Sequence, residues 1–316
     1  MAEQRIGVLA AIGACVIWGL SPIYYKALAH VPPPEVLAHR AIWSLVFFCG
    51  VLALQSRLPE LLSAMYGRRR LAILAVASLM ITINWFLFIF AIQIGRTTEA
   101  SLGYYIFPLV AVLIGRLAFG EALGRPQWIA VGVAAAAVAL LTAGLGVAPW
   151  ISLVLAVTFG LYGAIKKQLP VGPVVSVTCE ILLFAPFAIA LLAWAHWDGQ
   201  GAFGSDGLDT ALLILSGPLT ATPLILFSVA ARRISLASLG LLNYINPTLQ
   251  FFCAVAIFAE PFSGLHAVVF AMIWVALALF SLSAWRQERA ARRLSMASVG
   301  VSTTVSRSNS DASAKP

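Results

Sequence analysis

Charged side chains are scarce in this sequence. Asp, Glu, Lys and Arg together make up 10% of the 316 residues, whereas hydrophobic residues make up 61%. Soluble domains carry about 25% charged residues, so the composition excludes an ordinary soluble fold. Apolar stretches of about 18 residues or more recur along the chain instead, and each could cross a hydrocarbon core of roughly 30 Å as a helix.

Motifs that carry catalytic or metal chemistry are also missing. The four cysteines lie in apolar stretches without a CxxC or Cys/His spacing, which argues against a disulfide framework and against a zinc site. No Walker-type glycine loop, HExxH or GxSxG sequence is present, and the four histidines are scattered. The sequence therefore predicts no bound metal, no cofactor and no enzymatic activity.

Hydropathy predicts ten membrane-spanning helices joined by short loops. The fold class expected is an all-α integral membrane protein, because the strands of a barrel would alternate in polarity at every second residue. The first stretch is too long for the apolar core of a signal peptide, so we expect an uncleaved first helix. The expected spans are residues 6–28, 35–55, 71–94, 98–119, 126–145, 149–167, 172–197, 209–231, 236–259 and 263–285.

The net charge of +8 is distributed unevenly between the loops. If the N-terminus is cytoplasmic, Lys26 and Arg96 fall on the outer side, Arg40 falls within a span, and the remaining Lys and Arg residues are cytoplasmic. This bias follows the positive-inside rule and predicts that both termini are cytoplasmic, with no role in nucleic-acid binding. Residues 286–316 are basic and then Ser-rich, and we expect a disordered tail near the anionic lipid surface.

A repeated phrase predicts an internal duplication. Arg96-Thr-Thr-Glu-Ala-Ser-Leu-Gly103 resembles Arg233-Ile-Ser-Leu-Ala-Ser-Leu-Gly240, and a proline and then a glutamate follow each copy. We interpret residues 1–145 and 149–285 as two five-helix repeats. An odd number of spans in each repeat requires the second to be inverted, and transporters of this kind bind their substrate between the repeats.

The prolines and glutamates of the two copies have separate interpretations. Pro108 and Pro247 lie within spans and should kink them, either beside a transport pathway or only to set helix shape. Glu121 and Glu260 immediately precede the next span, near the membrane surface, so we expect them to be structural caps of the helices that follow rather than sites of proton coupling. Arg125 lies one turn after Glu121 and is a further expected partner.

Two ionisable residues lie at equivalent positions inside apolar spans. Arg40, next to His39, is in the second span, and Glu180 is in the seventh. Intramembrane charges usually face the interior of the helix bundle and mark pathways. Arg40 could hold a substrate carboxylate, and Glu180 could hold an amine or a coupling proton. Alternatively, each residue could snorkel or satisfy a neighbouring helix, and a direct salt bridge between them is not required.

Other polar and aromatic residues of the spans either line a wet cavity or hold helices together. Asn243, Asn246 and Gln250 share one helix face because they are spaced by three and four residues. The full set of candidate substrate-binding residues is Trp18, His39, Arg40, Asn84, Trp85, Tyr104, Glu180, Asn243, Tyr244, Asn246 and Gln250.

Over residues 5–285 the sequence resembles EamA-type transporters of the drug/metabolite transporter superfamily, and more closely their RarD subgroup. The motifs in question are Ile-Trp-Gly at 17–19, His-Arg-Ala-Ile-Trp-Ser at 39–44, Asn-Trp-Phe-Leu-Phe-Ile at 84–89, Glu-Ala-Ser-Leu-Gly-Tyr at 99–104, Asn-Pro-Thr-Leu at 246–249 and Ile-Trp-Val-Ala-Leu-Ala at 273–278. The resemblance implies a multi-pass permease of the bacterial inner membrane that moves an amino acid, a related metabolite or a chloramphenicol-type compound.

The hypothesis from sequence is therefore a secondary transporter that works by alternating access, with a small-molecule substrate, the lipid bilayer and a coupling proton as its partners. The alternative is a non-transporting polytopic membrane protein, either a lipid-modifying enzyme or a sensor. Substrate identity, direction, coupling ion and oligomeric state stay open at this point.

Overall fold

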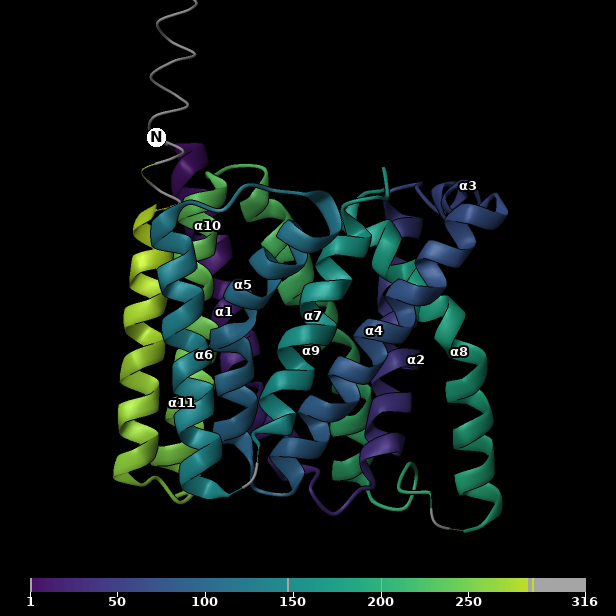
Figure 1. Cartoon of the computed structure of the whole chain (residues 1–316). Helices are drawn as coiled ribbons and strands as arrows, with labels where there is room; N and C mark the ends of the chain where they lie inside the picture. Colours follow the sequence, from purple (N-terminus) through teal and green to yellow (C-terminus); the bar gives the residue numbers. More distant parts are fainter. Residues whose placement is uncertain (1, 147, 200, 284–285, 287–316) are drawn as a thin grey trace, which may run out of the picture.

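The computed structural model describes residues 2–146, 148–199, 201–283 and 286, which form helices joined by short loops (Figure 1). The predicted tail therefore lies almost entirely outside the described residues. The labelled helices are α1 Ala2–Ala27, α2 Pro33–Leu54, α3 Pro59–Met65, α4 Arg68–Gln93, α5 Thr97–Phe119, α6 Arg125–Leu145, α7 Trp150–Lys166, α8 Pro173–Trp197, α9 Gly207–Ala231, α10 Leu236–Asn243 and α11 Ile245–Phe252. A π-helical turn, Cys253–Ile257, follows α11, and Gly264–Ser283 forms a further helix, here called the last helix.

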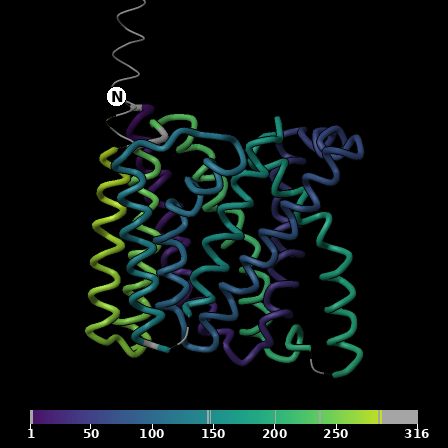
Figure 2. The backbone as a smooth tube through the Cα atoms, viewed as in Figure 1, coloured from purple at the N-terminus to yellow at the C-terminus, as the bar shows by residue number. Residues whose placement is uncertain are grey.

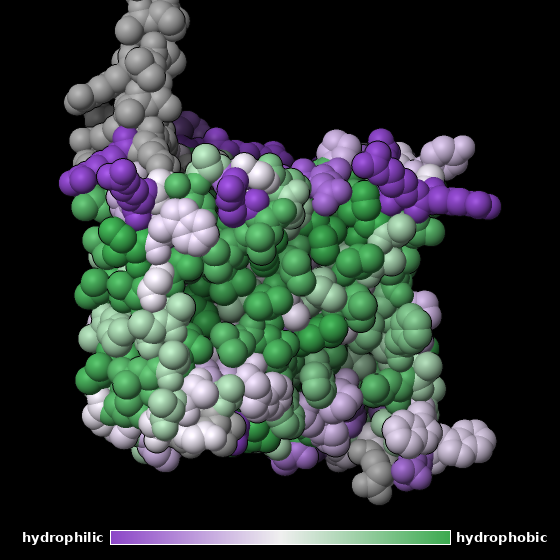
Figure 3. Space-filling view, viewed as in Figure 1, coloured by the Kyte–Doolittle hydropathy of each residue, from purple (hydrophilic) through white to green (hydrophobic). Residues whose placement is uncertain are grey.

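The helices form a polytopic membrane fold. Within the described ranges, nine helical segments are long and apolar enough to cross a membrane, and α7 is a shorter apolar helix. A broad hydrophobic belt covers the visible face, and hydrophilic residues gather at its two rims (Figure 3). The all-α integral membrane class is confirmed, whereas the tenth crossing depends on α7 and stays a prediction.

The chain crosses the belt back and forth, and α1 begins at the same rim at which the last helix ends (Figure 2). We call this the N-terminal rim and the opposite one the far rim. α5 runs from the far rim to the N-terminal rim, whereas α10 and α11 run the other way (Figure 1). The two copies of the repeated phrase therefore begin helices that point in opposite directions.

The expected span 236–259 is interrupted in the structure, which corrects its prediction as one helix. α10 ends at Asn243, α11 begins at Ile245, and the π-helical turn follows. Pro247 lacks an N–H and cannot bond the carbonyl of Asn243, which accounts for a break at this point. α5 continues through Pro108. The second copy has two extra residues before its proline, so the equivalent prolines act in different local settings.

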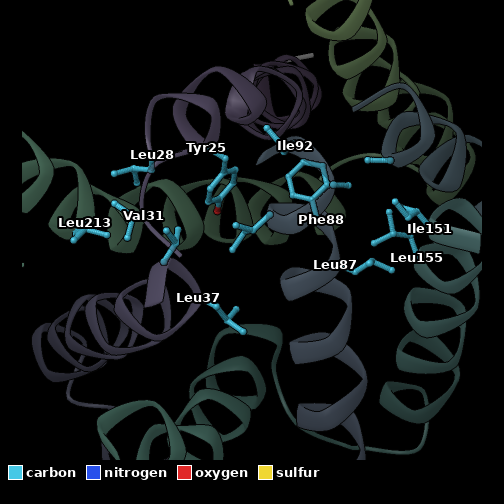
Figure 4. Packing of buried hydrophobic residues seen from close by; sticks show 14 residues of the cluster. Tyr25, Leu28, Val31, Leu37, Leu87, Phe88, Ile92, Ile151, Leu155 and Leu213 are labelled. Carbon is cyan, nitrogen blue, oxygen red and sulfur yellow. The ribbon is translucent and has the colours of Figure 1, made fainter. Parts of the chain in front are cut away.

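One buried cluster joins helices from both predicted halves. Its members include Tyr25 of α1, Leu37 of α2, Phe88 of α4, Leu155 of α7 and Leu213 of α9 (Figure 4). Because lipid is as apolar as these side chains, close packing rather than water exclusion holds such helices together. The interior of the bundle is therefore a shared interface between the halves, and the candidate site is built on it.

Small residues allow close contacts between helices. A Cβ on Gly103 of α5 would lie 2.8 Å from the carbonyl oxygen of Ser152 on α7, and one on Gly19 of α1 would lie 2.6 Å from the Cβ of Leu249 on α11. Glycine at these positions lets the backbones approach as small residues do in membrane helix pairs.

Candidate functional site

Arg40 lies inside the bundle, where four helices meet. Only 6% of the residue is exposed. Its Nε donates to the Oγ1 of Thr220 on α9 at 2.9 Å, and its guanidinium lies 4.1 Å from the ring centre of Trp85 on α4. The ring of Tyr25 on α1 is 5.8 Å away. No carboxylate oxygen of the described residues lies within 4.0 Å of Arg40. The cation is therefore stabilised by a hydroxyl and by ring faces rather than by a counter-ion.

Asn84 and Tyr104 lie in the same interior and tie three helices together. The Tyr104 hydroxyl on α5 donates to the Oδ1 of Asn84 at 2.9 Å. The Asn84 side-chain amide donates to the Leu155 carbonyl at 2.9 Å and to the Thr158 hydroxyl at 3.0 Å, both on α7. Asn84 is fully buried. With both its donor and its acceptor groups bonded, Asn84 acts as a bridge between helices, while the ring of Tyr104 packs edge-on against Phe88.

Glu180 does not pair with Arg40. It is 1% exposed, and its carboxylate accepts from the Nζ of Lys166 at 2.7 Å and from the hydroxyls of Tyr162 and Ser176, both at 2.9 Å. Sequence reasoning missed Lys166 and Tyr162. Lys166 ends a span, where the positive-inside bias already accounts for a lysine, but a lysine at that position can also reach a carboxylate on the next span.

His39 points away from Arg40, toward the loop between α8 and α9. Its ring stacks on Phe203 with centroids 5.0 Å apart, and its Nε2 lies 3.9 Å from the Oε1 of Glu35. Glu35 accepts a hydrogen bond from the Ala202 amide at 2.7 Å. His39 and Glu35 therefore anchor this loop to α2, and the structure does not bring His39 together with the Arg40 interior.

The polar residues of α10 and α11 make contacts of their own. Gln250 donates to the Oδ1 of Asn246 at 2.9 Å, and the Oδ1 of Asn243 lies 3.9 Å from the Cys15 sulfur on α1. Trp18 packs against Phe227 of α9. Tyr244 faces a groove of about 400 Å³ lined by Tyr105, Leu241, Tyr244, Thr248, Trp274, Leu277, Ala278 and Ser281. None of these contacts reaches Arg40, so these residues are separate from the Arg40 interior, as Glu180 and His39 also are.

The structure corrects the roles expected for the two glutamates. Glu260 does cap a helix, but the helix is α5 rather than the one that follows: its Oε1 accepts from the Thr97 amide at 2.7 Å and its Oε2 from the amide and hydroxyl of Thr98 at 2.8 Å. Glu121 pairs with Lys167 instead of Arg125. In both cases a left-handed residue, Gly120 or Ala259, precedes the glutamate, and this geometry turns the chain back at the end of a helix.

Comparison with known proteins agrees with the resemblance seen in the sequence. Residues 5–143 match the model of the EamA-like transporter family. The chain is 40% identical to "Protein RarD" of Streptomyces exfoliatus over 96% of this chain and 98% of that protein. It is 37% identical to "Protein RarD" of Escherichia coli strain K12, over 91% and 97%. It is 30% identical to the "Chloramphenicol-sensitive protein RarD" of Pseudomonas aeruginosa, over 91% and 96%.

A solved structure shares the fold. It aligns with a TM-score of 0.57 over 89% of this chain and 97% of that chain, at 19% sequence identity. At this identity the likeness concerns the fold alone. The sequence relatives cover nearly the full length of both chains at 30% identity or more. The chain therefore belongs to the EamA-like transporter family, as a RarD-type membrane transporter.

Proposed function

We propose that this protein is a secondary transporter that moves a small organic solute across the bacterial inner membrane by alternating access, with Arg40 at the solute site. The observation that carries the proposal is the position of Arg40. Its guanidinium is buried between α1, α2, α4 and α9 without a carboxylate in contact among the described residues. An intramembrane charge is costly, and it usually marks a substrate or ion pathway.

The packing of the helices supports two inverted repeats. In the proposed scheme α1, α2, α4 and α5 of the first half correspond to α7, α8, α9 and the α10–α11 pair of the second. Exchanging the halves turns the contact of α5 with α7 into that of α1 with α11, and the contact of α4 with α7 into that of α1 with α9. The contact of α4 with α8 likewise becomes that of α2 with α9. A site enclosed by helices of both halves suits alternating access.

The charge distribution supports an orientation with both termini in the cytoplasm. Basic residues expected to be cytoplasmic begin α4, at Arg68, and α6, at Arg125, and both helices begin at the N-terminal rim (Figure 1). Lys26 and Arg96 lie at the ends of helices at the far rim. By the positive-inside rule, the N-terminal rim is the cytoplasmic side.

The contacts of Glu180 change its proposed role. Three donors already occupy its carboxylate, so we propose that it stabilises the junction of α7 and α8 and does not hold a substrate amine. The match to the EamA-like transporter family favours transport over the alternative of a lipid-modifying enzyme or a sensor.

The proposal can be tested without knowing the solute. Proteoliposomes are loaded with a small-molecule extract of bacterial cells, and the solutes released over time are measured by mass spectrometry. At least one solute should leave faster than from protein-free liposomes, and Arg40→Ala should abolish that release. Arg57→Ala is the matched control, because Arg57 lies in an exposed loop and pairs with Glu60. Release indistinguishable from protein-free liposomes for every solute would contradict a transport function.

A further inference from the structure

We propose, resting on the transport function above, that the Arg40 site selects a monoanion: a carboxylate attached to an apolar or aromatic body, rather than a zwitterion such as an amino acid. Three features of the site carry this proposal. They are the terminal nitrogens of Arg40, which donate to no described residue, the buried carboxylates, which already have partners, and the aromatic rings beside the guanidinium.

The guanidinium of Arg40 is only partly used. Its Nε is bonded to Thr220, and neither terminal nitrogen donates to a described residue. Neither of them is among the fully enclosed polar atoms that lack a partner. Arginine presents its N–H groups as a planar fork. The end of that fork matches the two oxygens of a carboxylate, which it binds through two parallel charge-assisted hydrogen bonds.

The buried acidic residues of the described chain, Glu35, Glu180 and Glu260, are already engaged, and the half-buried Glu99 of α5 pairs with Arg96 through one oxygen. Glu180 is bonded to Lys166, Glu35 accepts from the Ala202 amide, and Glu260 caps α5. A substrate ammonium group would therefore meet Arg40 without a free carboxylate to balance it. A buried cation without a counter-ion is costly, and an anionic solute would supply the missing charge.

Aromatic rings form much of the wall around the guanidinium. Trp85 lies under the guanidinium, and Tyr25 and Tyr104 both pack edge-on against Phe88. The Tyr104 hydroxyl is bonded to Asn84, so this tyrosine offers mainly its ring. Such walls favour an apolar or aromatic body attached to the carboxylate.

The test uses four ligands with one skeleton and different charge: 3-phenylpropionate, 3-phenylpropionamide, phenylalanine and 2-phenylethylamine. Thermal unfolding of the purified full-length protein is measured with each, together with a wider set of aromatic and aliphatic monocarboxylates and their amides. Carboxylates should raise the unfolding temperature while their amides do not. Arg40→Gln should weaken the binding by about tenfold or more, and Arg40→Lys should restore only part of it, because it keeps the charge without the fork.

Equal stabilisation by phenylalanine or the amine would overturn the proposal, as would no stabilisation by any monocarboxylate at millimolar concentration. Counterflow in proteoliposomes separates this failure from failure of the proposed function. A carboxylate that binds through Arg40 but is not moved would leave the charge preference intact and contradict transport. Zwitterions that are bound and transported would support transport and contradict the preference for a monoanion.

A second inference concerns the two glutamates that end equivalent helices. The chain turns in the same way before each: Gly120 and Ala259 have φ values of 67° and 52°, and the amides of Glu121 and Glu260 both bond the carbonyl six residues earlier. The side chains differ. Glu260 is 9% exposed and holds the start of α5, whereas the side chain of Glu121 is 46% exposed and pairs with Lys167.

We infer that Glu260 is a clamp that closes the pathway at the far rim, and that Glu121 is its counterpart at the N-terminal rim. The contact of Glu260 with α5 is favourable, because a carboxylate at the start of a helix accepts hydrogen bonds from the free amides and is attracted by the positive end of the helix dipole. The start of α10, equivalent to that of α5, is capped by its own residue Ser235. In the opposite-facing conformation, Glu260 releases Thr97 and Thr98, while Glu121 leaves Lys167 and binds the first amides of α10.

Spin labels are attached to cysteines introduced at two exposed positions of the far rim, by Ile94→Cys and Ser263→Cys. The background carries Cys49→Ala, because Cys49 is half-buried and the other three native cysteines are buried. Glu260→Gln should add a longer distance population between the labels, since it removes the charge that holds α5. Thr98→Val, which removes one of the three hydrogen bonds, should give a smaller shift in the same direction. Glu121→Gln should leave this distance unchanged. The inference is overturned by wild-type distances in Glu260→Gln and Thr98→Val, or by an equal shift in Glu121→Gln.

Discussion

Replacing Lys166 by Met gives a sharp prediction, because it removes the charge next to Glu180 and keeps an unbranched chain of similar length. Glu180 is 1% exposed and would retain only the hydroxyls of Tyr162 and Ser176. Removing one partner of a buried ion pair costs about 3–5 kcal/mol, because the other charge is left uncompensated. We expect Lys166→Met to lower the free energy of unfolding by an amount in this range.

The reverse replacement should cost less. Glu180→Gln keeps one acceptor oxygen for the Tyr162 or the Ser176 hydroxyl, and the other hydroxyl can accept from the new amide group. The side chain of Lys166 is 20% exposed and can turn toward the nearby rim. We therefore expect a cost of about 1–3 kcal/mol for Glu180→Gln. In the double variant the uncompensated charge is gone, so its stability should exceed that of Lys166→Met alone.

Equilibrium unfolding by SDS in mixed micelles measures all four proteins of this double-mutant cycle. The informative quantity is the coupling free energy between Lys166 and Glu180, which we expect to be favourable and larger than the cost of Glu180→Gln alone, so at least about 1 kcal/mol. A cost below about 1 kcal/mol for Lys166→Met, as for an exposed ion pair, would refute the reasoning. Strict additivity of the two single changes would refute it as well.

Three further changes test the packing and backbone of the bundle by the same unfolding measurement. Gly103→Ala should destabilise the protein by about 1–3 kcal/mol, because its Cβ would lie 2.8 Å from a carbonyl oxygen of α7. The control Gly132→Ala, which has open space around it, should be neutral or stabilising. Equal effects of the two changes would contradict the packing argument. Asn84→Ala leaves the Tyr104 hydroxyl without its partner and should cost about 1–3 kcal/mol; an unchanged stability would argue against the bridge. Ala259→Gly should stabilise by about 1 kcal/mol, because glycine adopts the left-handed backbone without strain; destabilisation would show that the strain argument fails.

The sequence predicted the membrane class and the burial of Arg40 and Glu180, because charge scarcity and the position of a residue within an apolar run need no tertiary information. It could not predict their partners. Thr220 and Trp85 reach Arg40 from helices distant in the chain, and Lys166 stood at a span end, where positive-inside bias already explained it.

The local breaks were predictable only in part. The two extra residues before Pro247 indicated a departure from the first copy, but where the chain reforms a helix depends on packing with α1 and α5. The role of Glu260 was misjudged for a related reason. Its position before the last helix indicated a cap, whereas the left-handed Ala259 turns the chain and the carboxylate binds α5, which lies far earlier in the sequence.

The most direct test of the central claim is counterflow in proteoliposomes. The ligand is the monocarboxylate that stabilises the purified protein most strongly, placed unlabelled inside and labelled outside. A carrier that alternates around Arg40 should give transient accumulation of label in the wild type and none in Arg40→Gln protein that remains folded. Accumulation by both proteins, or by neither, would contradict a transport cycle centred on Arg40.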